Sequence, residues 1–172
     1  LSMDVSWTKS TAGSLSALNR ALSTALTRLS QLRELKLNFH NHTLLGEAGV
    51  TAVSMLTRLT AMQLRPIKAT PSLSASLQQL PVQLQRLELT IAAEPGTITE
   101  VKVDLAQLTV LQHLHLSMPH GWFQVGSALP PYATSLELHT KPYHPLSFPP
   151  KALEVLGVCG LQQLRFLELD SV

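Results

Sequence analysis

The chain of 172 residues contains little cysteine, little charge and few aromatic residues. Its single cysteine, Cys159, cannot form a disulfide bond within the chain, which favours a reducing, intracellular compartment over a secreted, disulfide-stabilised architecture. Charged residues make up 14% of the chain, so many surface positions must be occupied by uncharged polar residues. Aromatic residues make up 5%, which predicts a core built mainly from aliphatic side chains.

Several longer patterns are also missing, and each absence argues against a class of function. No apolar run reaches the roughly 20 residues that a transmembrane helix needs, so we expect no membrane span. The 13 basic and 11 acidic residues are interspersed, and without a block of lysine and arginine we expect no nucleic-acid partner.

Catalytic motifs are missing as well. The chain contains no GxSxG, HExxH or CxxC motif and no glycine-rich phosphate loop. Cys159 lies just before a leucine-rich segment. We therefore expect it to be a small buried side chain and not a catalytic nucleophile. A flat sheet face would also lack the cleft that a pair of catalytic carboxylates requires. We therefore predict no enzymatic activity, no catalytic residues and no cofactor.

The sequence has instead a repeated pattern of three apolar residues at positions 0, +3 and +5. It occurs in six copies, whose first residues are 22 to 31 residues apart, and sixteen of the eighteen positions are leucine. A fixed apolar template at this period is typical of a solenoid, in which each repeat stacks on its neighbours. The copies are Leu32/Leu35/Leu37, Leu59/Met62/Leu64, Leu84/Leu87/Leu89, Leu111/Leu114/Leu116, Ala133/Leu136/Leu138 and Leu164/Leu167/Leu169.

The apolar spacing around these copies predicts alternating helices and strands. Leucines at helical spacing predict a helix over 15–29, with a strand over 34–38 where the period changes to two. Apolar residues within 44–56 share one helical face and predict a second helix. Residues 97–105 alternate apolar and polar side chains, which predicts a short extended segment in place of a helix.

The first full repeat carries a more specific resemblance. Residues 32–56 read LxxLxL, a turn, LGxxGxxxV and a helix, and this pattern is similar to the LxxLxL, turn, LGxxGxxxL and helix of the ribonuclease-inhibitor-like class of leucine-rich repeats. The resemblance implies an α/β solenoid in a horseshoe arc, with a parallel sheet on its concave side and helices or irregular segments on its convex side. A looser form of the pattern spans 15–172 and implies one domain of about six repeats over 1–172.

Two further features of the sequence bear on this resemblance. It lacks the polar caps that cover the ends of a solenoid, so we expect it to be a fragment of a longer protein. The family also usually has asparagine at +8, where the side chain bonds the neighbouring backbone, and here no such asparagine ladder is expected. The six +8 positions are His40, Ile67, Ala92, Pro119, Lys141 and Val172.

The residues between the leucines are expected to point outward on the concave sheet. Because the side chains of a strand alternate between its two faces, stacked repeats should align these residues in rows with members about 4.8 Å apart. One row reads Lys36, Gln63, Glu88, His115, Glu137 and Glu168; the row before it reads Glu34, Ala61, Arg86, His113, Ser135 and Phe166; the row after it reads Asn38, Arg65, Thr90, Ser117, His139 and Asp170.

These rows predict a charged surface with two different ends. Basic residues gather toward the N-terminal repeats and acidic residues toward the C-terminal ones, which would orient a partner of matching polarity. The alternative is that the rows are simply a polar strand face in water. The candidate partner-binding residues are Lys36, Arg65, Arg86, Glu88, His113, His115, Glu137, His139, Phe166 and Glu168.

Histidine and carboxylate residues come together in the middle of the predicted face. Glu88 and Glu137 flank His115 on neighbouring strands, with His113 and His139 nearby, and this donor set could hold zinc. We nevertheless predict no metal site, because side chains two apart on a flat strand should diverge too far for a closed site. The carboxylate neighbours favour the charged form of His115, which would make binding sensitive to pH.

Two connections are further candidate sites. The segment 141–151 contains four prolines, which exclude regular structure, and Tyr143 and Phe148 could bind a partner there. Apolar residues of this segment could equally pack back on the convex side, and we favour that second interpretation. His40 and His42 follow the first strand, where solvated turn histidines are expected and not a metal pair.

The prediction for function is a non-enzymatic module that binds another protein on its concave face. The alternative is a structural subunit or segment of a large assembly. The low charge and the missing caps support this alternative. The family resemblance also implies a third possibility, the substrate-recognition part of a complex of the ubiquitin-ligase type.

Overall fold

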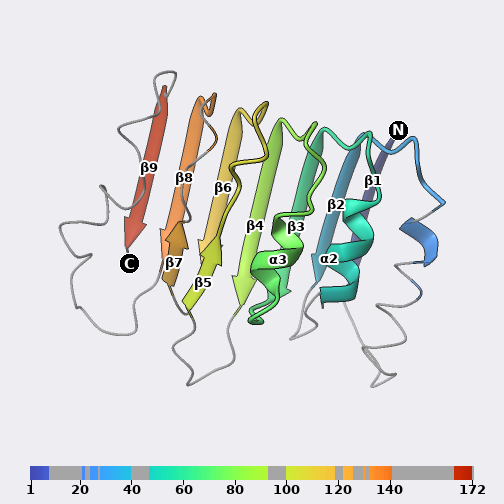
Figure 1. The fold of residues 1–172 in the computed structure, drawn as a ribbon, viewed down its shortest axis with the longest axis horizontal. Coiled ribbons are helices and arrows are strands. Elements are labelled where there is room, and N and C mark those ends of the chain that lie inside the picture. The colour runs from blue at the N-terminus through green and yellow to red at the C-terminus, as the bar shows by residue number, and fades with distance from the viewer. Residues whose placement is uncertain are drawn as a thin grey trace.

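The computed structural model describes residues 1–7, 21, 24–26, 28–39, 47–92, 100–118, 122–125, 130, 132–140 and 165–171. These residues form an α/β structure in which a seven-stranded parallel sheet is covered on one face by helices and short strands (Figure 1). The sequence-based prediction of an α/β class with a parallel sheet is therefore confirmed.

The main sheet follows the order of the chain. Its strands lie in the order β1-β2-β3-β4-β6-β8-β9, and every neighbouring pair is parallel. Parallel neighbours require a return connection on one side of the sheet. The strands are β1 (Ser2–Trp7), β2 (Glu34–Phe39), β3 (Ala61–Lys68), β4 (Arg86–Ala92), β6 (His113–Met118), β8 (Ser135–Thr140) and β9 (Phe166–Ser171).

The return connections build a second layer on one face of this sheet. They contain α2 (Glu47–Ser54), α3 (Leu73–Leu77), β5 (Glu100–Val103) and β7 (Trp122–Val125). Helix α2 contacts α3, α3 contacts β5, and β5 pairs in parallel with β7. Figure 1 shows all four elements in front of the main sheet, with β5 and β7 running opposite to its strands. We call the other side of the sheet the open face, because no described helix or strand covers it.

The core lies between the main sheet and the second layer. Every residue of the first five 0/+3/+5 copies is buried, and the register pairs the copies with one another, as in Leu87 with Leu114 and Leu89 with Leu116. The sixth copy is in the same register, since Leu167 pairs with Leu136 and Leu169 with Leu138. These residues form strands because their alternation presents one apolar side chain in every two to the same face.

A repeated hydrogen-bond pattern marks the start of each strand. The Arg33 carbonyl accepts from the backbone N–H groups of Thr60 and Ala61, at N···O distances of 2.8 and 3.0 Å. Five other carbonyls also accept two backbone hydrogen bonds, namely those of Leu1, Thr60, Gln85, Gln112 and Thr134. Apart from Leu1, which precedes β1, each of these residues and Arg33 is one residue after position 0 of its copy.

Two threonines strengthen this pattern with their side chains. The Thr60 hydroxyl donates to the Arg33 carbonyl at 3.1 Å, and the Thr134 hydroxyl donates to the Gln112 carbonyl at 3.0 Å. The repeat in the sequence thus corresponds to a repeat in backbone hydrogen bonding. These bonds give a donor partner to the carbonyl that precedes each strand.

Several sequence-based predictions of elements can be checked directly. The strand predicted over 34–38 is β2, the helix predicted within 44–56 contains α2, and the extended segment predicted over 97–105 contains β5, so all three are confirmed. The count of six strands was too low, because β1 adds a seventh to the sheet. Helix α3 and strand β7 were also missed. The helix predicted over 15–29 lies mostly outside the described residues, although Leu26 is fully buried.

The +8 positions without asparagine lie in different surroundings. Ile67 is buried inside β3, and the carbonyl of Ala92 accepts a hydrogen bond from the N–H of Ala69 at 3.0 Å. The backbone therefore finds a partner there without an asparagine side chain. The other four positions lie outside the described residues, as do Cys159, His42 and the segment 141–151.

Candidate functional site

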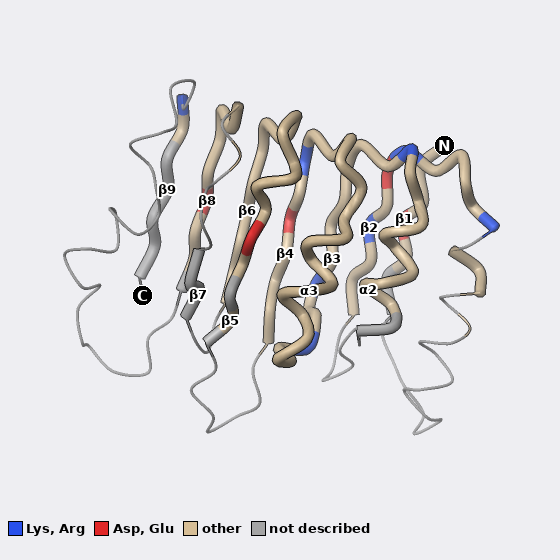
Figure 2. The backbone as a smooth tube through the Cα atoms, in the orientation of Figure 1, with Lys and Arg blue, Asp and Glu red and all other residues tan. Residues whose placement is uncertain are grey.

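The open face carries two of the three predicted rows in the predicted order. Register pairs Lys36 with Gln63, Glu88 with His115 and Glu137 with Glu168, which confirms the first row across all six strands. The row from Glu34 to Phe166 is confirmed in the same way. The third row is interrupted, because the pairing of β3 with β4 shifts between Leu64 and Ile67. Charged residues are sparse along the strands (Figure 2).

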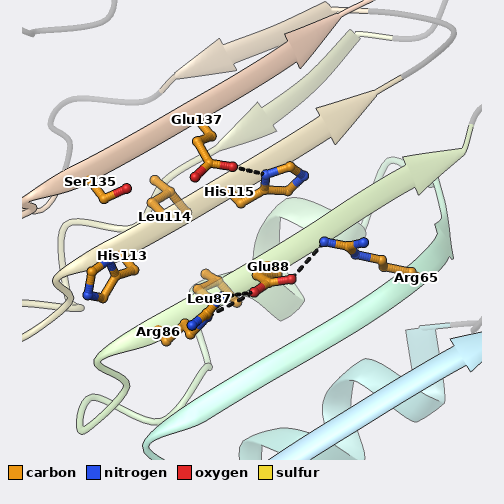
Figure 3. Close-up of a pocket in the computed structure, with 9 residues that line it drawn as sticks. All are labelled: Arg65, Arg86, Leu87, Glu88, His113, Leu114, His115, Ser135 and Glu137. Carbon is orange, nitrogen blue, oxygen red and sulfur yellow. Dashed lines mark hydrogen bonds and ion pairs between the residues drawn. The ribbon is translucent and has the colours of Figure 1, made fainter. Parts of the chain in front are cut away.

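A hollow lies in the middle of the open face. It has a volume of about 260 Å³, and the buried leucines of β4 and β6 form part of its lining (Figure 3). Polar side chains from four strands surround these leucines. The open face was predicted to be flat, and the structure corrects this at its centre, where the surface is hollowed. The lining residues are Arg65, Arg86, Leu87, Glu88, His113, Leu114, His115, Ser135 and Glu137.

Glu88 organises one side of this hollow. Its Oε2 lies 2.7 Å from Arg65 Nη2, and its Oε1 lies 2.7 Å from Arg86 Nη2 and 2.8 Å from Arg86 Nε. The Glu88 side chain is only 14% exposed, whereas those of Arg65 and Arg86 are 39% and 62% exposed. Two guanidinium groups thus hold one half-buried carboxylate in a fixed position, and Figure 3 shows both of them directed at it.

This arrangement changes the predicted charge pattern. Arg65 and Arg86 were expected to give the N-terminal strands a positive surface. Because both pair with Glu88, part of their charge is compensated on the sheet itself. The contrast between a basic and an acidic end is consequently weaker than the sequence suggested.

His115 and Glu137 organise the other side of the hollow. His115 Nδ1 lies 2.7 Å from Glu137 Oε2, with the two side chains 20% and 35% exposed. His139, two residues after Glu137 on β8, places its ring centroid 5.0 Å from that of His115, with the ring planes tilted by 42°. One nitrogen or oxygen atom from each of the three residues lies within 4.8 Å of the other two. The expected divergence of these side chains is therefore not observed for this trio.

A second hollow of about 210 Å³ lies beside the first, toward the N-terminal strands. Arg86 and Glu88 line both hollows, so their ion pair forms the boundary between them. Lys36 contributes to this second hollow from β2. Its remaining lining residues are Glu34, Leu35, Ala61, Met62 and Gln63.

The candidate residues from the sequence occupy both hollows and the C-terminal edge. Most of them line a hollow, while Phe166 lies exposed on β9, the last strand of the sheet. Glu168 pairs in register with Glu137, and its side chain lies outside the described part of the structure. The candidate residues chosen from the sequence did not include four open-face members of the predicted rows that line the hollows, namely Glu34, Ala61, Gln63 and Ser135. Three of these four side chains are uncharged, so their residue types alone gave no signal for a site.

Comparisons of this chain with known proteins found no relative. No protein-family model, no curated protein and no solved structure matches this chain. Among the described residues, the helices are all too short or too polar to cross a membrane.

Proposed function

We propose that this chain is a leucine-rich-repeat solenoid that binds a partner protein on its open face and has no enzymatic activity of its own. The observation that carries the proposal is the contrast between repeated and varied positions on the same strands. The buried rows are almost uniformly leucine, whereas the neighbouring open-face row changes in charge and chemistry from each strand to the next.

The repeat geometry supports the solenoid part of the proposal. Strands follow one another in chain order, their apolar copies are in register, and the same carbonyl position accepts two hydrogen bonds at each strand start. This is the behaviour expected when each repeat contacts only its neighbours. An extended sheet face built from such repeats is a common protein-binding surface.

The size and chemistry of the open face favour a protein over a small molecule. Seven parallel strands spaced about 4.8 Å apart give a strip about 29 Å wide, which is comparable to one side of a standard protein interface. The hollows are small and lined largely by charged and polar groups, whereas small-molecule sites are usually larger and mainly apolar. Exposed arginine and aromatic residues, here Arg86 and Phe166, are frequent anchors of protein interfaces.

Charge reversal on the open face tests this proposal. The R86E/E137K double variant keeps the net charge and alters both sides of the central hollow. Quantitative affinity capture from the native source should lose one or a few proteins that the unaltered chain retains, because complementary charges set partner choice and the rate of association.

The matched control is the R58E/D104K double variant, which also keeps the net charge but changes positions outside the main-sheet strands. It should retain the same proteins as the unaltered chain. Equal capture by all three proteins would contradict a recognition role for the open face. Circular dichroism and thermal unfolding would establish that the variants remain folded.

A structural role in a large assembly is the second candidate, and exposed apolar residues favour it. Met55, Val82, Val110 and Tyr132 are between 45% and 65% exposed, and each lies in the turn that precedes a strand of the main sheet. Apolar residues gathered at one edge of a sheet can mark a permanent interface. Under this role, the M55S/V110S variant would lose co-purifying subunits that the R86E/E137K variant keeps.

A further inference from the structure

We propose that His115, Glu137 and His139 form a binding site for a zinc ion on the open face. These residues come from two adjacent strands, β6 and β8, and the register pairs His115 with Glu137 and Ser117 with His139. The proposal is independent of whether the open face binds a protein.

The donor atoms are close enough for one ion. One imidazole nitrogen from each histidine and one carboxylate oxygen lie within 4.8 Å of one another. Two ligands of a tetrahedral zinc ion are about 3.4 Å apart when the bonds are about 2.1 Å long. Small rotations of these side chains would close this difference, because all three are half-buried and not locked in the core.

The chemistry of the trio selects the kind of metal. Imidazole suits zinc and similar transition metals, whereas calcium and magnesium prefer oxygen ligands alone. Two histidines and one glutamate form the protein ligand set of several zinc sites, which leave a further position to water or another ligand. A zinc ion here would therefore keep an open position facing away from the sheet.

The surrounding structure supports the ligands and reduces repulsion of a cation. The strands that carry them are anchored by Leu114, Leu136 and Leu138, which are buried in the core. The Glu137 carboxylate lies 2.7 Å from His115 Nδ1, so it is placed either to bind the ion or to orient the ring for binding through Nε2. Strand β4 lies on the other side of β6 and carries Glu88, which pairs with the two arginines that line the hollow. The charge of Glu88 partly offsets that of the arginines, which lowers the repulsion that a bound cation would meet.

Zinc titration of the untagged protein tests the site, and the chain supplies its own control. His113 lies on β6, two residues before His115, on the same face and outside the trio. We expect the unaltered protein to bind one zinc ion per chain in isothermal titration calorimetry. H115Q and H139Q should each weaken binding at least tenfold, while H113Q should bind as the unaltered protein does.

A second measurement needs no variant of the site. In nuclear magnetic resonance spectra of the unaltered protein, one equivalent of zinc chloride should shift the imidazole signals of His115 and His139 and leave those of His113 unchanged. A folded protein that binds no zinc, or one whose binding falls equally in H113Q, would overturn the proposal. Shifts spread over all histidines would overturn it as well.

Discussion

The two faces of the main sheet differ sharply although the same strands build both. Toward the second layer, one position of five successive strands holds Leu37, Leu64, Leu89, Leu116 and Leu138, all of them buried. On the open face, the position just before it changes from lysine to glutamine, glutamate, histidine and glutamate. Constant side chains on one face specify how repeats stack, so the differences between repeats are concentrated on the other face.

The largest expected effect comes from breaking the uniform face. Leu87→Ala and Leu114→Ala each remove side-chain atoms from a fully packed row and leave a cavity, and each should lower the free energy of unfolding by about 2–5 kcal/mol. Urea denaturation followed by circular dichroism measures this. His113→Ala, next to Leu114 but exposed, should change the free energy by no more than about 0.5 kcal/mol. If His113→Ala lowered the free energy of unfolding as much as Leu114→Ala, the assignment of a buried and an exposed face would be contradicted.

A smaller effect is expected on the open face at Glu88, a charged side chain that is only 14% exposed. Glu88→Gln removes the negative charge that holds Arg65 and Arg86, and should lower the free energy of unfolding by about 1 kcal/mol at low salt. The loss should shrink as salt is added, because the arginines are partly exposed and their interaction is screened.

The control for this change is Glu34→Gln, an exposed carboxylate at the start of β2 on the same face. Its effect should stay below about 0.5 kcal/mol at any salt concentration. A loss at Glu88 that does not depend on salt would indicate that shape, and not charge, is what Glu88 contributes.

The smallest effect concerns the hydrogen bonds that join neighbouring strands. Thr60→Val removes the hydroxyl that donates to the Arg33 carbonyl but leaves the two backbone donors in place. The free energy of unfolding should fall by about 0.5 kcal/mol, the low end for a hydrogen bond, because the site is exposed. Thr57→Val, in the preceding turn, should have no measurable effect. A loss above about 2 kcal/mol would show that the hydroxyl and not the backbone maintains this junction.

Much of the fold could be predicted from the spacing of leucine alone. The strands were located by the 0/+3/+5 pattern, and the inward positions were correct wherever the structure describes the side chains. Strand β1 was missed because its alternation consists of only two apolar residues, Met3 and Val5, and neither is a leucine. Strand β7 does not carry the 0/+3/+5 pattern, and in the described part of the chain it pairs with the short strand β5 in the second layer.

The arrangement of residues on the open face was predicted in part. Two of the three rows are in the predicted register, because register in a parallel sheet follows from the apolar pattern and a one-residue slip would expose the leucines. The pairing of Glu88 with two arginines was not predicted, since it depends on side chains that reach across strands and along one strand. The interruption of the third row at Arg65 was also not visible in the sequence.

For the strands that carry the 0/+3/+5 pattern, the sequence by itself determined which side is buried wherever the side chains are described, and which residues share the first two rows, because apolar spacing dictates burial and register. Only the tertiary structure decided how the open-face side chains combine. It placed Glu88 between two guanidinium groups, formed the two hollows, and brought His115, Glu137 and His139 within 4.8 Å of one another. The physical reason is that register fixes where a side chain starts, whereas its rotamer and its neighbours on adjacent strands fix where its polar atoms lie.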